Sequence, residues 1–145
     1  MENNFVKVHS YKDLAISAII LVAGIVLIFV NKVAGVVIIL CGLFSFLLYK
    51  SGYRLNNQEA LLQKRNLELS RKCQQSVLDF LNGKSTDLDL IPGNEGGTLL
   101  LEVWYNKEEK IAYSQLFVYQ ELIFKKITEV IKLNPSNAQI LIEKI

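Results

Sequence analysis

Charged side chains are almost absent from residues 14–49 of this 145-residue chain. Lys32 is the one charged residue in that stretch, and Asn31 beside it is the one amide. Asp, Glu, Arg and His, which ion pathways and proton relays in membranes usually need, do not occur there. The stretch therefore argues against a transporter or channel filter built from this chain alone.

Histidine and cysteine are also scarce. The one histidine, His9, precedes the apolar stretch, so the polar remainder has no histidine for acid–base catalysis or for a metal site. Cys41 lies inside the apolar stretch and Cys73 lies beyond it, which makes a disulfide between them implausible. This cysteine content suits a reducing compartment.

The apolar stretch divides into two runs, residues 14–30 and residues 33–49. A run of this length is close to the lower limit for crossing a hydrocarbon layer of about 30 Å as a helix. One helix through both runs would be roughly 54 Å long, which is far too long for a single span. The sequence therefore predicts a two-helix transmembrane hairpin with its tip at residues 31–32.

A tip of two residues leaves no room for a loop, so the two helices are expected to pack antiparallel. Folding the chain about this tip places Ala18 opposite Ser45 and Gly24 opposite Ile39. Small residues let transmembrane backbones approach closely. The candidates for such contacts, within the hairpin or between copies of it, are Ala18, Gly24, Gly35, Cys41, Gly42 and Ser45.

Basic residues near the ends of the two runs predict the orientation. Lys7 and Lys12 precede the first run, and residues 50–72 hold six basic residues against two acidic ones, whereas the tip has Lys32 alone. Positively charged flanks stay on the cytoplasmic side. We expect a two-pass inner-membrane protein with both termini, including a tail of residues 1–13, in the cytoplasm. The candidates for contact with lipid head groups are Lys50, Arg54, Lys64 and Arg65, with a solvated helix face as the alternative.

Residues 50–82 are interpreted as a basic juxtamembrane helix. Residues 54–82 contain good helix formers and neither proline nor glycine. Gly83 follows where a helix-ending glycine is usual. The apolar residues fall close to one helical stripe, which we expect to pack on the following sheet: Leu55, Leu62, Leu69, Cys73, Val77 and Phe80.

Residues 83–145 are interpreted as a small α+β module that begins with a Gly- and Pro-containing connector at 83–97. Two strands are expected over 98–105 and 110–120, joined by a turn at 106–109. Residues 121–133 fit either a helix or a third strand, and their β-branched content favours the strand.

Asn134 and Pro135 predict the start of a short C-terminal helix. Its apolar stripe would consist of Ala138, Leu141, Ile142 and Ile145. The predicted fold class is therefore an α+β membrane protein: a transmembrane hairpin, then a juxtamembrane helix packed on an antiparallel meander of two or three strands, then a short helix.

Motifs that carry chemistry are weak in this sequence. Gly83-Lys84-Ser85-Thr86 resembles the end of a phosphate-binding loop, but Leu78 stands where the first glycine belongs and a helix is expected before it. Three acidic residues of the connector could hold a hard cation or act on lipid or peptide, although a solvated loop is the simpler interpretation: Asp87, Asp89 and Glu95. No cofactor, metal site or catalytic set is predicted.

Aromatic residues on the two strands are the candidates for binding a partner: Trp104, Tyr105, Tyr113 and Tyr119. Trp and Tyr often anchor protein interfaces, but strand aromatics also fill cores. Trp104 shares a strand face with Glu102, which predicts that it points outward.

The sequence favours a non-enzymatic, membrane-anchored protein-interaction module, either an accessory subunit of a membrane assembly or an immunity-type inhibitor of a membrane-acting toxin. The expected partners are membrane lipid and another protein, or a second copy through the hairpin. A net charge of +2 is too small to argue for nucleic acid. The alternatives are an oligomeric, holin-like pore component and a membrane-bound enzyme acting on lipid or peptide.

Overall fold

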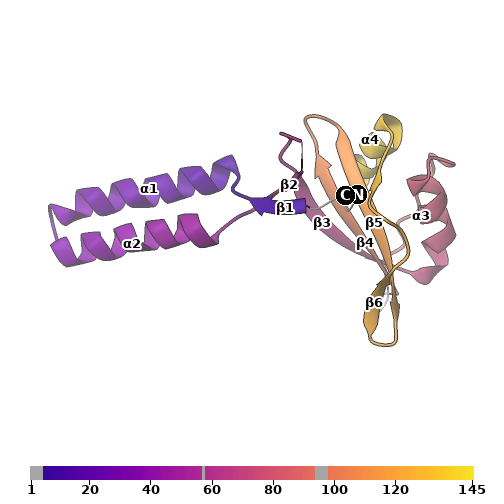
Figure 1. Cartoon of the computed structure of the whole chain (residues 1–145), viewed down its shortest axis with the longest axis horizontal. Helices are drawn as coiled ribbons and strands as arrows, with labels where there is room; N and C mark the ends of the chain where they lie inside the picture. Colours follow the sequence, from indigo (N-terminus) through magenta and orange to yellow (C-terminus); the bar gives the residue numbers. More distant parts are fainter. Residues whose placement is uncertain (1–4, 57, 94–97) are drawn as a thin grey trace. The chain divides into compact units, whose positions relative to one another are not determined.

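The computed structural model describes residues 5–56, 58–93 and 98–145 (Figure 1). These residues form helices and antiparallel strands, which confirms the predicted α+β class. The chain divides into two compact units, the first ending at Leu61 and the second running from Leu62 to Ile145.

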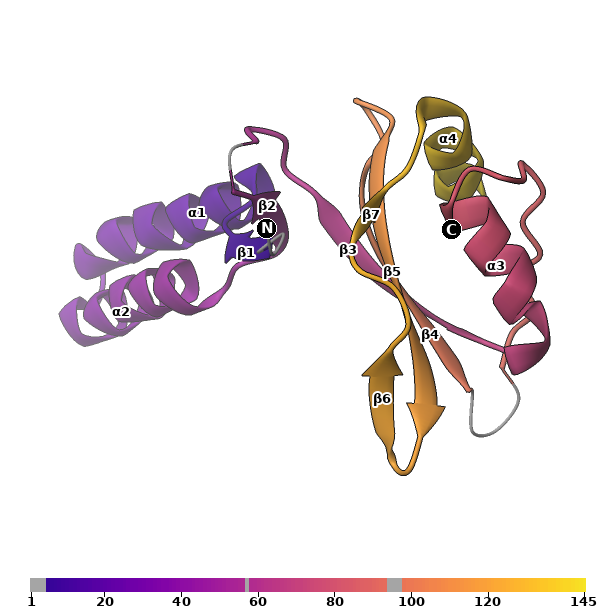
Figure 2. The ribbon, with the colours of Figure 1, turned by 45° about the vertical axis from the view of Figure 1, so that its right-hand side comes forward.

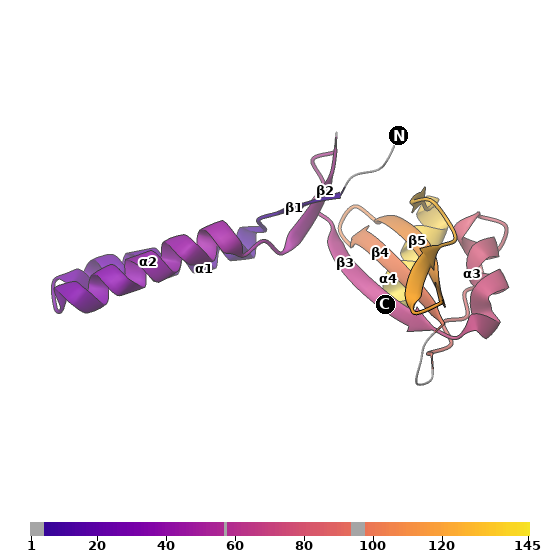
Figure 3. The ribbon, with the colours of Figure 1, turned by 60° about the horizontal axis from the view of Figure 1, so that its bottom comes forward.

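Two apolar helices dominate the first unit, α1 (Tyr11–Ile28) and α2 (Lys32–Leu48). They run antiparallel and side by side along their length (Figures 1 and 3). Each begins at a side-chain cap. Ser10 accepts a hydrogen bond from the Asp13 backbone N–H, and Asn31 accepts one from Ala34 at 3.2 Å. These caps satisfy backbone N–H groups that have no partner within the helix.

Glycines on the inner sides of both helices set how closely α1 and α2 approach. A Cβ atom on Gly24 would lie 2.7 Å from Cγ1 of Ile39, so the predicted pairing of these two residues is confirmed. A Cβ on Gly35 would lie 2.5 Å from the backbone nitrogen of Ile28, and one on Gly42 would lie 3.0 Å from the Leu21 side chain. Three glycines spaced along the pair therefore keep the backbones close.

A two-stranded ribbon joins the segment before α1 to the segment after α2, at the end of the helical pair opposite the turn. Strand β1 (Phe5–Val8) pairs antiparallel with β2 (Gly52–Leu55), with Phe5 opposite Leu55 and Val8 opposite Gly52. Residues 1–13 were expected to be a plain tail, so this ribbon is a correction. It forms because the hairpin brings its own flanks together, which local composition does not reveal.

The predicted juxtamembrane helix over residues 50–82 is wrong for most of its length. Strands β2 and β3 (Gln63–Leu69) occupy its first part, and helix appears only in the 3₁₀ turn η1 (Arg71–Cys73) and α3 (Gln74–Leu81). Pairing of β3 with the next strand overrides the helix propensity of its residues. Asn57, within the same prediction, lies outside the described residues.

The second unit is built on an antiparallel sheet ordered β3-β4-β5-β6. Strands β4 (Leu99–Asn106) and β5 (Ile111–Gln120) confirm the two predicted strands. The ambiguous segment that follows is strand in two pieces, β6 (Ile123–Lys126) and β7 (Ile131–Lys132), and both pieces pair with β5.

Helices α3 and α4 (Pro135–Lys144) cover the same face of the sheet (Figure 2). The core lies between them and alternate residues of the central strands, including Leu99, Leu101, Val103 and Leu116. The start of α4 is the predicted one, because Asn134 caps it and Pro135 occupies its first turn. The opposite surface of the sheet, called the open face here, carries the intervening residues of the same strands, such as Leu100, Trp104, Tyr113 and Phe117.

A glycine and a buried amide fix the ends of the helices in this core. Gly83 has a φ of +72° just after α3, in the left-handed conformation that glycine adopts without strain, and its predicted helix-ending role is confirmed. Asn137 of α4 is buried, and its Nδ2 donates hydrogen bonds to the carbonyl oxygens of Phe80 at 2.8 Å and Ser85 at 3.0 Å. This amide connects α4 to the end of α3.

The glycine contacts of the first unit generate a stability prediction. We expect Gly35→Leu to weaken the pairing of α1 and α2 by about 1–3 kcal/mol, because the added side chain meets the backbone of Ile28, which cannot move aside cheaply. The measurement is the distance distribution between spin labels at Val22→Cys and Leu40→Cys in detergent, with Cys41→Ser as background. The distribution should become longer and broader.

The matched control is Val36→Leu, because Val36 adjoins Gly35 on the same helix and is exposed. It should leave the label distances unchanged. An equal response to both substitutions would mean that Gly35 does not set the approach of the helices.

Candidate functional site

The surface of the helical pair is apolar on its outer sides. Exposed large side chains are found throughout α1, the connecting turn and α2, and they include Ile19, Val22, Ile25, Val26, Phe29, Val33, Val37, Leu40, Phe44 and Leu47. The fully buried residues at the contact between the helices are small, Ser17, Gly24, Gly35 and Gly42, with side chains such as Leu21 and Ile39 packed beside the glycines. Soluble proteins rarely expose a continuous apolar surface of this extent.

Helix α1 is the one described helix that is long and apolar enough to cross a membrane, judged by its length and composition. Helix α2 is comparably apolar but one residue shorter, with 17 residues from Lys32 to Leu48.

A cluster of hydrogen bonds closes the base of the helical pair. Oδ2 of Asp13 accepts hydrogen bonds from the backbone N–H of Ser10 at 2.9 Å, from the backbone N–H of Ser51 at 3.0 Å and from the Ser51 hydroxyl at 2.8 Å. His9 stacks on the Phe46 ring with 4.6 Å between centroids, and its Nε2–H donates to the Phe46 carbonyl oxygen. These contacts tie the start of α1 to the segment that follows α2.

The four basic residues predicted to meet lipid head groups fall into both units. Lys50 and Arg54 are exposed in the first unit, directly after α2 and on β2. Arg65 is exposed on β3 of the second unit. Lys64 is half-buried, and its Nζ lies 2.7 Å from Oε1 of Glu102. Lys64 is therefore engaged within the sheet.

The four aromatic candidates for partner binding are not equivalent. Tyr105 belongs to the core between the sheet and the helices. Trp104 and Tyr113 lie opposite each other on β4 and β5, and both are buried, at 5% and 2% exposure. Trp104 lies on the face of the sheet away from the helices, as predicted. The prediction that its side chain is exposed is wrong. Tyr119 alone is exposed, at 37%.

Charged side chains accompany the buried aromatic pair on the open face. The ammonium nitrogen of Lys64 lies 5.0 Å from the centroid of the Trp104 ring, and that of Lys132 lies 6.0 Å from the centroid of the Tyr113 ring. Cation–π contacts of this kind contribute about 0.5–1 kcal/mol at partly exposed sites. The half-exposed apolar side chains of this face lie further along the strands, where Leu100 is opposite Phe117.

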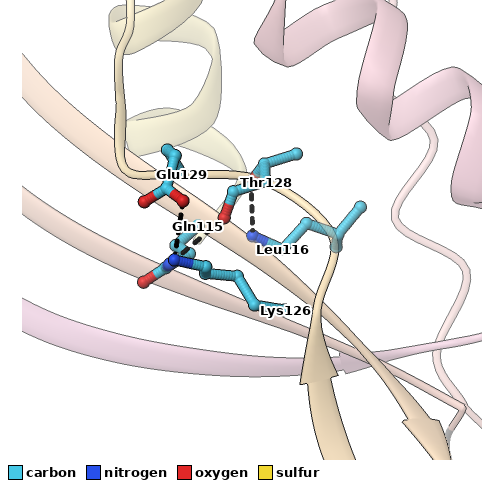
Figure 4. Close-up of polar contacts among 5 residues, drawn as sticks. All are labelled: Gln115, Leu116, Lys126, Thr128 and Glu129. Atoms are coloured by element: carbon cyan, nitrogen blue, oxygen red, sulfur yellow. Dashed lines mark hydrogen bonds and ion pairs between the residues drawn. The ribbon is translucent and has the colours of Figure 1, made fainter.

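Thr128 divides the last part of the sheet into two segments (Figure 4). Its hydroxyl accepts a hydrogen bond from the Leu116 backbone N–H at 3.0 Å, and its carbonyl accepts one from Nε2 of Gln115 at 3.1 Å. Lys126 and Glu129 form an ion pair of 2.7 Å on either side. In the segment between β6 and β7, the Thr128 side chain thus takes the place of regular strand pairing with β5. The β5–β6 hairpin extends beyond this point (Figure 2).

The end of the β5–β6 hairpin is apolar and exposed. Tyr119 and Phe124 lie opposite each other with ring centroids 5.1 Å apart, and Leu122 and Ile123 are exposed at 85% and 57%. The sequence interpretation did not identify this tip, because no glycine or asparagine marks a turn there. The available signal for this exposed tip was an apolar run, without a turn residue, between two predicted strands.

The acidic connector does not assemble into a described site. Asp87 and Asp89 are exposed, and the backbone N–H of Asp87 donates to the Ser85 hydroxyl at 3.0 Å. Glu95 lies outside the described residues. Across the part of the chain that the structure describes, no group of three or more His, Cys, Asp or Glu side chains gathers as metal ligands would. Cys73 is buried, and its Sγ donates to the Ser70 carbonyl oxygen.

Comparisons of the chain with protein-family models, with curated proteins and with solved structures found no match. The function must therefore be inferred from the surfaces described above.

The different burial of the aromatic candidates predicts different effects on stability. We expect Trp104→Ala to lower the free energy of unfolding by about 3–5 kcal/mol, because it empties a buried site beside Tyr113. Tyr119→Ala, at an exposed site, should cost less than about 1 kcal/mol. Denaturant unfolding of the full chain in mild detergent measures both. Equal effects would contradict the burial of Trp104.

Proposed function

We propose that this protein is a non-enzymatic module held at a membrane by the α1–α2 pair, which acts by binding a protein partner through its second unit. The accessory subunit of a membrane assembly and the immunity-type inhibitor of a membrane-acting toxin are the two forms of this proposal. The observation that carries it is the packing of the helical pair, with three glycines at the contact between the helices and many large apolar side chains exposed on the outside.

Lipid is the solvent that suits such a surface. In water, the exposed valine, isoleucine, leucine and phenylalanine side chains of both helices would cost about 25 cal/mol for each Å² of apolar surface. In a bilayer the same side chains are solvated, and every backbone group inside a helix already has its hydrogen bond. Close glycine contacts are also how apolar helices associate where no hydrophobic force drives them together.

The proposal takes both helices as spanning segments. Helix α2 is near the lower length limit for a span. It is packed against α1 at Gly24, Gly35 and Gly42, from one end of the pair to the other. If α1 crosses the hydrocarbon layer, α2 must therefore occupy the same depth beside it.

Charge at the two ends of the pair supports a cytoplasmic location for both termini. Lys7, Lys12, Lys50 and Arg54 lie on the side of the ribbon, and Lys32 alone lies at the turn between the helices. In this arrangement Lys50 and Arg54 would meet the lipid head groups of the cytoplasmic leaflet.

For the partner-binding surface we propose the outer part of the open face. Leu100 and Phe117 are paired there across β4 and β5, half-exposed, on the side of the sheet away from α3 and α4. Glu102 and Gln115, the next pair along the same strands, supply a polar border. An apolar centre with a polar rim is typical of protein interfaces.

Membrane attachment predicts a specific response to charge. We expect the full chain to resist extraction from membranes by alkaline carbonate, and Val22→Arg to reduce the extraction-resistant fraction strongly. Val22 is exposed near the middle of the apolar run, where arginine costs about 2.5–3.5 kcal/mol in a bilayer. Asn56→Arg, outside the helices, is the control and should have no effect. A wild-type chain that stays in solution without detergent after high-speed centrifugation would sink the proposal.

Partner binding predicts that the open face is sensitive to charge. Phe117→Glu should abolish the recovery of a cross-linked partner with the tagged full chain from native membranes, while membrane attachment persists. Ile91→Glu changes an exposed apolar residue elsewhere in the second unit and should leave recovery intact. Recovery of nothing but the chain itself with the wild type would remove the partner from the proposal, and recovery of the partner with Phe117→Glu would remove the open face as its binding surface.

A further inference from the structure

The end of the β5–β6 hairpin concentrates the exposed apolar side chains of the second unit. Among its described residues, five large apolar side chains are exposed, and four of them belong to this hairpin: Tyr119, Leu122, Ile123 and Phe124. Ile91 is the fifth. The end of the hairpin extends away from the helices (Figure 2), and none of these four residues belongs to the core cluster.

The turn at this tip holds its residues in a conformation that disfavours them. Glu121 has a φ of +54° and Leu122 a φ of +67°, where glycine or asparagine is the usual residue. A leucine side chain in the left-handed region is strained, and at 85% exposure it contributes nothing to the core. The Leu122 side chain therefore adds strain to the turn without adding burial to the core.

The charges beside the tip are balanced within the hairpin and its flank. Nζ of Lys125 lies 2.5 Å from Glu121, and Nζ of Lys126 lies 2.7 Å from Glu129. These four charged side chains of the hairpin and its flank thus sum to no net charge. The tip therefore fits an apolar binding surface and not one that attracts by charge.

Size separates a lipid surface from a protein partner. A stable protein interface takes roughly 800 Å² and about 20–30 residues from each side, whereas the tip offers four. A bilayer needs no matching shape, and tyrosine and phenylalanine are favoured residues of its interfacial layer. A chain attached to a membrane also holds its own domain at high effective concentration near the lipid, so a small apolar contact suffices.

We propose that the tip formed by Tyr119, Leu122, Ile123 and Phe124 inserts into the interfacial layer of a lipid bilayer, as a second membrane contact besides the helical pair. This inference rests on the proposed membrane attachment of α1 and α2. Because the tip is electrically balanced, its insertion needs no anionic lipid and is insensitive to salt.

The test measures the depth of residue 122 in the full chain. A spin label at Leu122→Cys, with Cys41→Ser as background, is placed in nanodiscs of phosphatidylcholine that hold one chain each. Collisions of the label with oxygen, which enriches in lipid, and with a nickel complex, which stays in water, are compared. We expect the oxygen-to-nickel ratio to be several-fold higher at residue 122 than at Lys110→Cys, and unchanged by added salt.

Lys110 is the matched control because it also has positive φ, at +52°, in the turn of the neighbouring β4–β5 hairpin, and it is polar and exposed. Equal ratios at the two positions overturn the inference. Protection of residue 122 from both reagents also overturns it, since that result indicates a protein contact.

A second variant keeps the test independent of folding. Leu122→Gly removes the strained side chain, so the thermal unfolding midpoint should be unchanged or higher, as for Lys110→Gly. A label at Ile123→Cys should nevertheless lose its lipid signature in the Leu122→Gly chain. Failure of the chain to enter nanodiscs at all refutes the proposed membrane attachment, whereas entry with a water-exposed residue 122 refutes the tip insertion alone.

Discussion

Close contact between two helix backbones is the constraint on which the first unit depends. Gly24 and Gly35 leave no space for a side chain where the helices touch, and Gly42 lies in close contact with the Leu21 side chain. Side chains such as Ile39 and Leu21 fill the space beside these glycines, and many of the other large apolar side chains of both helices are exposed. The Asp13 hydrogen bonds and the β1–β2 ribbon then close the end of the pair that the turn does not close.

In the second unit, helices cover one of the two faces of the sheet, so the two faces differ in burial. On the covered face, Leu99, Leu101 and Leu116 form an ordinary apolar core with α3 and α4. On the open face, Trp104 and Tyr113 are buried beside lysine side chains, while apolar exposure is concentrated toward Leu100, Phe117 and the β5–β6 tip. The surfaces available for binding are therefore at one end of the strands and not at the aromatic pair.

Much of the fold follows from short-range patterns. The fold-back of the apolar stretch about residues 31–32, strands β4 and β5, and the helix that begins after Asn134 were all predictable, although the turn between the strands lies at 107–110 and was predicted at 106–109. Each depends on residues within a few positions of one another, or on composition alone. The candidate site was less predictable: of the four aromatic residues selected on composition, Tyr119 alone is exposed, and the strained tip next to it carries no turn residue that would identify it.

The sequence by itself determined that two apolar helices fold back on each other, and that a small antiparallel sheet with a C-terminal helix follows, although α1 begins and ends two to three residues before the predicted run of 14–30. The tertiary structure decided the strand conformation of residues 63–69 and the burial of Trp104. The reason is distance along the chain. Strand β3 exists because it pairs with β4, as in the contact of Lys64 with Glu102, 38 positions apart, and helix propensity within residues 54–73 carries no information about that partner.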